Sequence, residues 1–207
     1  MNSLAHGAPS QSVQDLVKLI SKQTKAHWLS VNLQINIRSS SNQLWSPPQT
    51  GWLKLNTDAA FSFDKGHCGV ILKNDLGSIL LAAVNHFSCM DAISAECIAI
   101  LDACKIINNL KLEQVIFESD SLIAISWLNG HSNNRFWTAS PVIEQIRKIW
   151  NGWPSWIFKF APRSANGAAH ALAKWASFDS FVGFIDLDSI PISVFCDKGF
   201  PLVNSLF

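Results

Sequence analysis

Three acidic side chains of this 207-residue chain lie where a metal site can be assembled from ordinary secondary structure. Asp58 ends a strand-like run at 52–58, and Asp120 directly follows the compact apolar run 115–119. Glu96 lies near the start of a helical pattern. If the two strands are neighbours and the helix packs over them, the three carboxylates converge at a cleft. Carboxylate oxygens are the hard ligands that Mg²⁺ prefers, so this arrangement predicts a divalent metal site.

Glu96 carries the sharpest physical signal of the three acids. It falls in the middle of the apolar face of a helix predicted over 94–109, so it should face the sheet. A buried carboxylate needs a cationic partner, a proton or a metal at the open edge of the core. The structural alternative is that Glu96 lies in the first helical turn, where the helix dipole favours a Glu that can cap Ser94 or Ile93.

Asp120 has a structural alternative as well. A helix is predicted from about residue 120 to residue 128, and Asp is a good N-cap residue at such a position. Ligands, however, also collect at strand ends in open α/β sheets, and Asp58 lies at another strand end. Both interpretations of Asp120 therefore stay open at this point.

A helix predicted over 165–176 adds further polar groups. Asn166 and His170 lie one turn apart on the shoulder of its apolar face, from which a side chain can overlook a cleft. A half-exposed helical His is nevertheless usually an ordinary surface residue. Arg163 lies just before this helix and Lys174 within it, so two cations accompany the polar pair.

The elements that must position these residues form an α/β pattern. Strands are predicted over 52–58, 67–73, 79–84, 115–119 and 156–160, and helices over 94–109, 120–128, 141–150 and 165–176. Turn residues at 74–77 join the second and third strands in a hairpin, so the first three strands are antiparallel. Helices separate the later strands, which favours parallel pairing and a mixed sheet.

The chain divides into three parts. Pro47 and Pro48 suit neither a helix interior nor a central strand, so they separate the first strand from what precedes it. We expect residues 1–44 to be a leader or linker that is partly helical or disordered, and residues 45–177 to form the folded domain. Residues 178–207 are an apolar tail of unknown structure.

Composition indicates a globular intracellular protein. Hydrophobic residues make up 48% of the chain and charged residues 15%, which suffices for a core. A net charge of +1 gives no indication of a nucleic-acid partner by itself. The five cysteines form no CxxC pair, and neither a secretory signal nor an apolar run of about 20 residues is found. We therefore expect reduced thiols, no membrane contact, an intracellular location and a monomer.

Four dispersed motifs occur in a recognisable order. They are Trp-x-Pro-Pro-x-x-Gly-Trp-x-Lys-x-Asn-x-Asp-Ala at 45–59, Ala-Glu at 95–96, Glu-Ser-Asp-Ser at 118–121 and Arg-x-x-Asn-x-x-Ala-His-x-Leu-Ala at 163–173. Together they resemble the ribonuclease H-type domain of plant non-LTR retrotransposon reverse transcriptases and their stand-alone relatives. Four motifs in order are far more specific than any one of them.

The resemblance implies a ribonuclease H-like α/β fold, with a five-stranded mixed sheet and helices on both faces. It also implies an Asp-Glu-Asp-Asp set that binds two divalent ions, Mg²⁺ or alternatively Mn²⁺. Asp58, Glu96 and Asp120 match the first three acids, and His170 takes the place of the fourth. The implied reaction is endonucleolytic hydrolysis of the RNA strand of an RNA–DNA hybrid, with ions that activate water and stabilise the leaving 3′ oxygen.

His170 is the main departure from the family pattern. A neutral nitrogen suits a hard cation poorly and removes one negative charge, so the second ion should bind less tightly. The alternative function is therefore a catalytically weakened or inactive module that binds nucleic acid or a protein partner. A proofreading-type exonuclease is disfavoured, because that class has Asp-x-Glu in its first strand and Asp58 is followed by Ala59-Ala60.

Candidate substrate contacts lie close to these motifs. Charged groups, Arg163 and Lys174, would contact phosphate, and polar groups, Asn56 and Asn166, can reach a 2′-hydroxyl. Further candidates lie in the polar stretch between two predicted helices: Asn133, Asn134 and Arg135.

Overall fold

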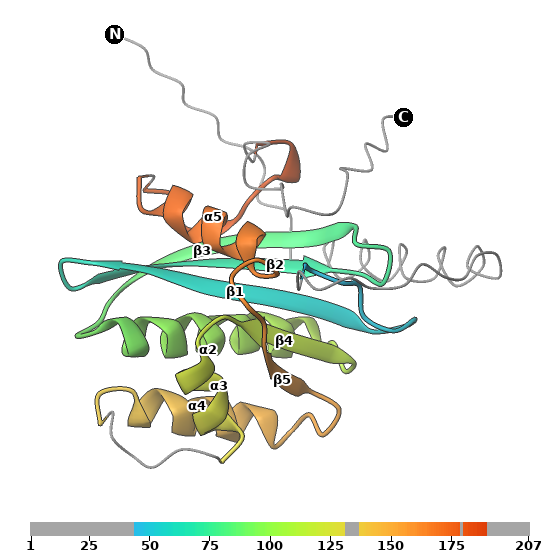
Figure 1. Cartoon of the computed structure of the whole chain (residues 1–207), viewed down its shortest axis with the longest axis horizontal. Coiled ribbons are helices and arrows are strands. Elements are labelled where there is room, and N and C mark those ends of the chain that lie inside the picture. The colour runs from blue at the N-terminus through green and yellow to red at the C-terminus, as the bar shows by residue number, and fades with distance from the viewer. Residues whose placement is uncertain (1–43, 131–136, 179, 190–207) are drawn as a thin grey trace, which may run out of the picture. The chain divides into compact units, whose positions relative to one another are not determined.

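The structure is a computed structural model that describes residues 44–130, 137–178 and 180–189 (Figure 1). Its strands are β1 (Leu53–Ser62), β2 (Lys65–Lys73), β3 (Ile79–Ser88), β4 (Val115–Ser119), β5 (Ile157–Phe160) and β6 (Gly183–Phe184). Its helices are α2 (Ala92–Leu110), α3 (Leu122–Leu128), α4 (Ser140–Trp150), α5 (Gly167–Ala176) and the 3₁₀ helix η1 (Leu187–Ser189). The predicted leader up to residue 43 and the candidates Asn133, Asn134 and Arg135 lie outside the described residues.

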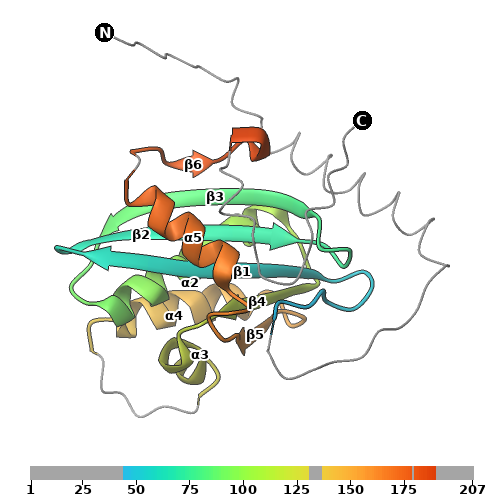
Figure 2. The same ribbon diagram turned by 45° about the horizontal axis from the view of Figure 1, so that its top comes forward.

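A mixed sheet organises the described part of the chain, with strand order β5-β4-β1-β2-β3-β6. The hairpin strands β1, β2 and β3 are antiparallel, whereas β1 pairs with β4, and β4 with β5, in parallel. Helix α5 lies on one face of the sheet, and α2 lies on the other face with α4 packed behind it (Figures 1 and 2). The predicted mixed α/β fold with helices on both faces is confirmed.

The sheet has six strands rather than the five predicted. The additional strand β6 lies in the segment 178–189, where no structure was predicted, and pairs antiparallel with the edge of β3. Next to it, Ile185 donates its N–H to Ala82 O at 2.9 Å and joins the core under α5. A strand of two residues is too short to show alternating apolar and polar residues in the sequence. Its formation depends instead on the exposed edge of a partner strand.

Element boundaries differ from prediction mainly at the ends of the hairpin strands, where β3 also runs to Ser88 rather than to residue 84. The helices begin and end within two residues of prediction, but β1 extends to Ser62 and β2 begins at Lys65. Phe63 and Asp64 form the turn between them with positive φ angles of 49° and 61°. Such tight turns usually carry Gly or Asn. This turn has neither of them, so the sequence did not predict it. Among the described helices, none is long and apolar enough to cross a membrane.

Gly69 sets how closely α5 packs on the sheet. A Cβ at this position in β2 would lie 2.6 Å from Ala173 N and 2.7 Å from Ala169 O. Both atoms belong to the backbone of α5, so no side chain can turn away to make room. The missing side chain therefore brings α5, which carries His170, close to β1 and β2.

Gly69→Ala is expected to destabilise the protein by about 3 kcal/mol, because the added methyl group must push a whole helix away from the sheet. Urea unfolding followed by circular dichroism measures this change. Gly152→Ala is the matched control, since the nearest atom to its new Cβ is Ile149 O at 3.3 Å, and it should cost less than about 1 kcal/mol. Equal effects of the two substitutions would show that close packing at Gly69 is not needed.

Candidate metal centre

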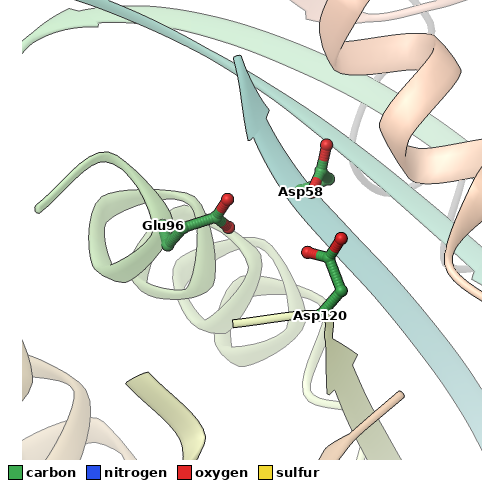
Figure 3. Close-up of side chains that lie close together, drawn as sticks. All are labelled: Asp58, Glu96 and Asp120. Carbon is green, nitrogen blue, oxygen red and sulfur yellow. The ribbon is translucent and has the colours of Figure 1, made fainter. Parts of the chain in front are cut away.

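The three predicted acids converge in the structure. One carboxylate oxygen from each of Asp58, Glu96 and Asp120 lies within 4.8 Å of the others, and Figure 3 shows the side chains pointing toward one another. The parallel pairing of β1 with β4 explains this, because Thr57↔Ser119 is the last pair of the ladder. The residue that follows each member of this pair in the chain is an Asp, so Asp58 and Asp120 lie together where β4 ends. Helix α2 brings Glu96 to the same place (Figure 3).

Glu96 faces the sheet and does not cap its helix. The N-cap of α2 is Asp91, whose Oδ1 accepts a hydrogen bond from Ser94 N at 2.7 Å. The Oε2 atom of Glu96 is buried and has no hydrogen-bond partner. The capping interpretation is therefore wrong, and a buried carboxylate oxygen is left available for a cation.

Asp120 is not a helix cap either. Ser121 caps α3, since its Oγ accepts a hydrogen bond from Ala124 N at 3.3 Å. The N-cap interpretation of Asp120 is wrong by one residue. Its side chain instead points toward Asp58 and Glu96 (Figure 3).

Two acids of the cluster have raised pKa values, although the charge of Arg163 lowers both in part. Burial is the main cause that raises the pKa of Asp58 to about 8, and the charge of Asp120 and a side-chain hydrogen bond with it add to this. Burial and then the charges of Asp58 and Asp120 raise the pKa of Glu96 to about 9. Three hard oxygen donors with one unpartnered buried oxygen fit a divalent cation such as Mg²⁺.

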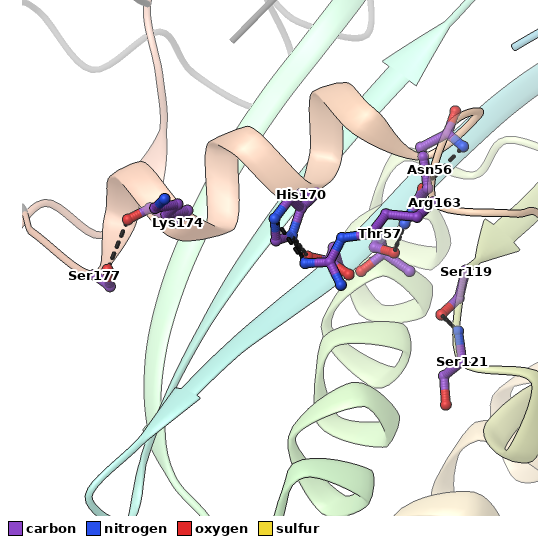
Figure 4. Close-up of polar contacts among 10 residues, drawn as sticks. Asn56, Thr57, Ser119, Ser121, Arg163, His170, Lys174 and Ser177 are labelled. Atoms are coloured by element: carbon purple, nitrogen blue, oxygen red, sulfur yellow. Dashed lines mark hydrogen bonds and ion pairs between the residues drawn. The ribbon is translucent and has the colours of Figure 1, made fainter. Parts of the chain in front are cut away.

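His170 lies at the fourth position and contacts the cluster. Its Nδ1 lies 2.8 Å from Asp58 Oδ2. Arg163 Nη2 lies 2.7 Å from the Nε2 of His170 and 2.8 Å from its Nδ1 (Figure 4). Burial and the nearby Arg163 lower the pKa of His170, which favours the neutral ring. With Asp58 ionised, Nδ1–H donates to the carboxylate and Nε2 accepts from Arg163. His170 thus adds a hydrogen bond to a predicted ligand in place of a fourth charge.

The predicted nucleic-acid contacts fall into two groups. Arg163 and Lys174 are exposed, and Lys174 lies one turn beyond His170 on α5. Asn56 and Asn166 are only 2% and 0% exposed, and their side chains are hydrogen-bonded inside the protein. The prediction that these two amides contact nucleic acid directly does not fit their burial. The sequence could not predict this burial, because the hydrogen-bond partners of these amides lie far away in the chain.

Sequence reasoning missed a buried ion pair beside the cluster. Lys54 Nζ lies 2.8 Å from Glu118 Oε1, and their side chains are 8% and 11% exposed. The sequence did contain a sign of this pair, because Lys54 and Glu118 are opposite charges among the apolar residues of two strands. The register of the parallel pair places Asn56 opposite Glu118, which brings these polar groups together.

Comparisons with known proteins agree with this architecture. A family model described as reverse transcriptase-like matches residues 56–176. Ribonuclease H1 from Halobacterium salinarum superposes with a TM-score of 0.58 at 21% identity, covering 62% of this chain and 99% of that one. No curated protein matches the chain.

Two further solved structures have the same fold. LC11 ribonuclease H1, isolated from compost and solved in complex with an RNA/DNA hybrid, has a TM-score of 0.55 at 20% identity and covers 60% of this chain and 95% of that one. The foamy viral protease-reverse transcriptase, also with an RNA/DNA hybrid, has a TM-score of 0.51 at 19% identity and covers 82% of this chain and 29% of that one. At these identities the likeness is one of fold.

The raised pKa values predict how stability depends on pH without metal. The folded protein keeps a proton on Glu96 up to about pH 9, whereas the unfolded chain releases it near its ordinary value. The contribution of Glu96 to stability is therefore fully present at low pH and is lost as pH rises through this window. Glu96→Gln removes the loss and should stabilise the metal-free protein at pH 8 by about 2 kcal/mol, with no gain at pH 4.

Urea unfolding at several pH values in the presence of a chelator measures this difference. Glu144→Gln is the control, because its side chain is 59% exposed on α4 and should leave the pH profile of the parent unchanged. If Glu96→Gln and the parent have parallel pH profiles, Glu96 is not held in a repulsive buried cluster.

Proposed function

The chain belongs to the reverse transcriptase-like family and has a ribonuclease H-like fold, and on this premise we propose that it is a metal-dependent endoribonuclease. Its substrate would be an RNA–DNA hybrid, of which it hydrolyses the RNA strand. The observation that carries the proposal is the convergence of Asp58, Glu96 and Asp120 within 4.8 Å. Glu96 and Asp120 do not cap the adjoining helices, since other residues do so.

Each residue of the site has a part in this proposal. Asp58, Glu96 and Asp120 would hold two divalent ions, Mg²⁺ or Mn²⁺. When bound, such ions supply an activated water and stabilise the leaving 3′ oxygen. His170 orients Asp58 through its Nδ1–H. Arg163 and Lys174 are exposed cations beside the cluster and would neutralise and position the phosphates of the substrate.

A second candidate function is a binding module that does not cut efficiently. The contacts of His170 with Asp58 and with Arg163 favour it, because a ring held beside a cation stands in place of the predicted fourth acid. This exchange leaves less negative charge for a second ion. Such a module would still bind nucleic acid, or a protein partner, through the same fold.

Divalent ions should stabilise the folded protein, because they bind the clustered carboxylates and not the unfolded chain. Millimolar Mg²⁺ or Mn²⁺ is expected to raise the melting temperature of the parent and to have little effect on Asp58→Asn. Glu144→Gln has the same change in charge away from the site and should keep the response. A parent whose melting temperature is indifferent to both ions would count against the metal site.

Cleavage of a labelled RNA–DNA hybrid tests the activity directly. The parent should cut the RNA strand with Mg²⁺ or Mn²⁺ and leave single-stranded RNA and duplex DNA intact. Asp58→Asn should reduce the rate at least about 100-fold, because it removes a metal ligand. His170→Asp restores the family's fourth acid and should increase the rate. No cleavage by the parent in either metal, together with cleavage by His170→Asp, would overturn the enzyme and support the binding module.

A further inference from the structure

A buried network of polar side chains joins β1, β4 and α5 beside the acidic cluster. Asn56 is its centre: Oδ1 accepts from Trp45 Nε1 at 2.8 Å, and Nδ2 donates to Glu118 Oε2 and to Asn166 Oδ1, both at 3.1 Å. Each of the four residues is at most 8% exposed. A buried amide with all these bonds has one favourable orientation, because any other leaves polar atoms unpaired.

The network lies close in the chain to Asp58, Asp120 and His170. Asn166 Nδ2 donates to Thr57 O at 3.0 Å, which ties the start of α5 to the residue before Asp58. His170 follows one turn later, and its N–H donates to Asn166 O at 3.0 Å. Glu118 lies two residues before Asp120 on β4. The network therefore reaches the backbone next to Asp58, Asp120 and His170, although none of its own side chains belongs to the cluster.

The negative charge of the network is balanced internally. Glu118 Oε1 pairs with Lys54 Nζ at 2.8 Å, and Lys54 Nζ also donates to Ser46 O at 2.7 Å. A buried ion pair with additional hydrogen bonds is strongly destabilised when one partner is removed, so it holds its geometry firmly. It also ties the chain segment before β1 to the centre of the sheet.

Trp45 lies at the end of the network, where it donates to Asn56. Its indole is 4% exposed and packs with Ala161 and Ala165, which flank the turn that carries Arg163. Lys73 Nζ lies 4.4 Å from the ring centroid, a distance suited to a cation–π contact. The same ring that donates to Asn56 thus also supports the loop leading into α5.

We propose that Trp45, Asn56, Glu118 and Asn166 are positioning residues that hold Asp58, Asp120 and His170 at working distance from one another. The inference rests on the proposed metal site and adds that the site depends on a buried amide network rather than on its ligands alone. Loss of the Trp45 N–H leaves Asn56 Oδ1 without its donor. The amide is then no longer held in one orientation, and the start of α5 is released from β1.

Trp45→Phe tests the proposal, because it keeps a buried ring and removes only the N–H donor and part of the ring area. Trp153→Phe is the matched control, since Trp153 Nε1 also donates to an Asn side chain, Asn108 Oδ1, at 2.8 Å. That bond lies at the far end of α2 and contacts neither α5 nor the cluster. A purely structural role predicts that neither substitution changes metal binding by the folded protein.

Two measurements separate the variants. Calorimetric titration with Mn²⁺ should give a dissociation constant about tenfold higher for Trp45→Phe than for the parent, and a change below about threefold for Trp153→Phe. In metal-free protein, amide hydrogen exchange of the segment 166–170 should be about tenfold faster in Trp45→Phe only. Equal dissociation constants and equal exchange rates in the two variants would overturn the proposal.

The design distinguishes this inference from the proposed function. A parent that binds no Mn²⁺ refutes the metal site, and the exchange rates alone then decide whether Trp45 holds α5. A parent that binds, with a Trp45→Phe variant that binds equally well, refutes only the positioning role. If Trp45→Phe does not fold, Asn166→Ala takes its place, because Asn166 makes no side-chain cap bond that the substitution would also remove.

Discussion

The parallel pairing of β1 with β4 is the constraint on which the rest of the site depends. Because the ladder ends at Thr57↔Ser119, the next residue of each strand, Asp58 and Asp120, emerges at one edge of the sheet. A shift of register by one residue would send one carboxylate to the opposite face. Helix α2 then needs only to present its buried-facing Glu96 to the same edge to complete a cluster of three acids.

Such a cluster is unfavourable in itself, and the surrounding structure compensates for it. Burial and mutual repulsion raise the pKa values of Asp58 and Glu96, so ionising these carboxyls in the metal-free protein is unfavourable. Beside it, Asn56 is the centre of an amide network and Lys54 pairs with Glu118. Ionisation of the cluster is unfavourable, whereas this network is held by hydrogen bonds. This combination is expected where a cation completes the site.

A histidine contacts the cluster at the position where the sequence predicted a replacement for a fourth acid. His170 reaches the site because α5 packs closely over Gly69, and Arg163 reaches it from the turn before α5. His170 contacts Asp58, and Arg163 contacts His170, so a ring backed by a cation lies beside the first acid. This arrangement places a hydrogen bond at Asp58 and adds no fourth negative charge to the cluster.

The sequence by itself determined the order of the elements and the mixed sheet, because periodicity and turn chemistry are local properties. It left Glu96 and Asp120 open between cap and ligand, gave Asn56 and Asn166 as nucleic-acid contacts, and had no signal for β6. Only the tertiary structure decided these points. Burial of a polar residue and formation of a short edge strand depend on partners far away in the chain, and local patterns carry no record of register between distant segments.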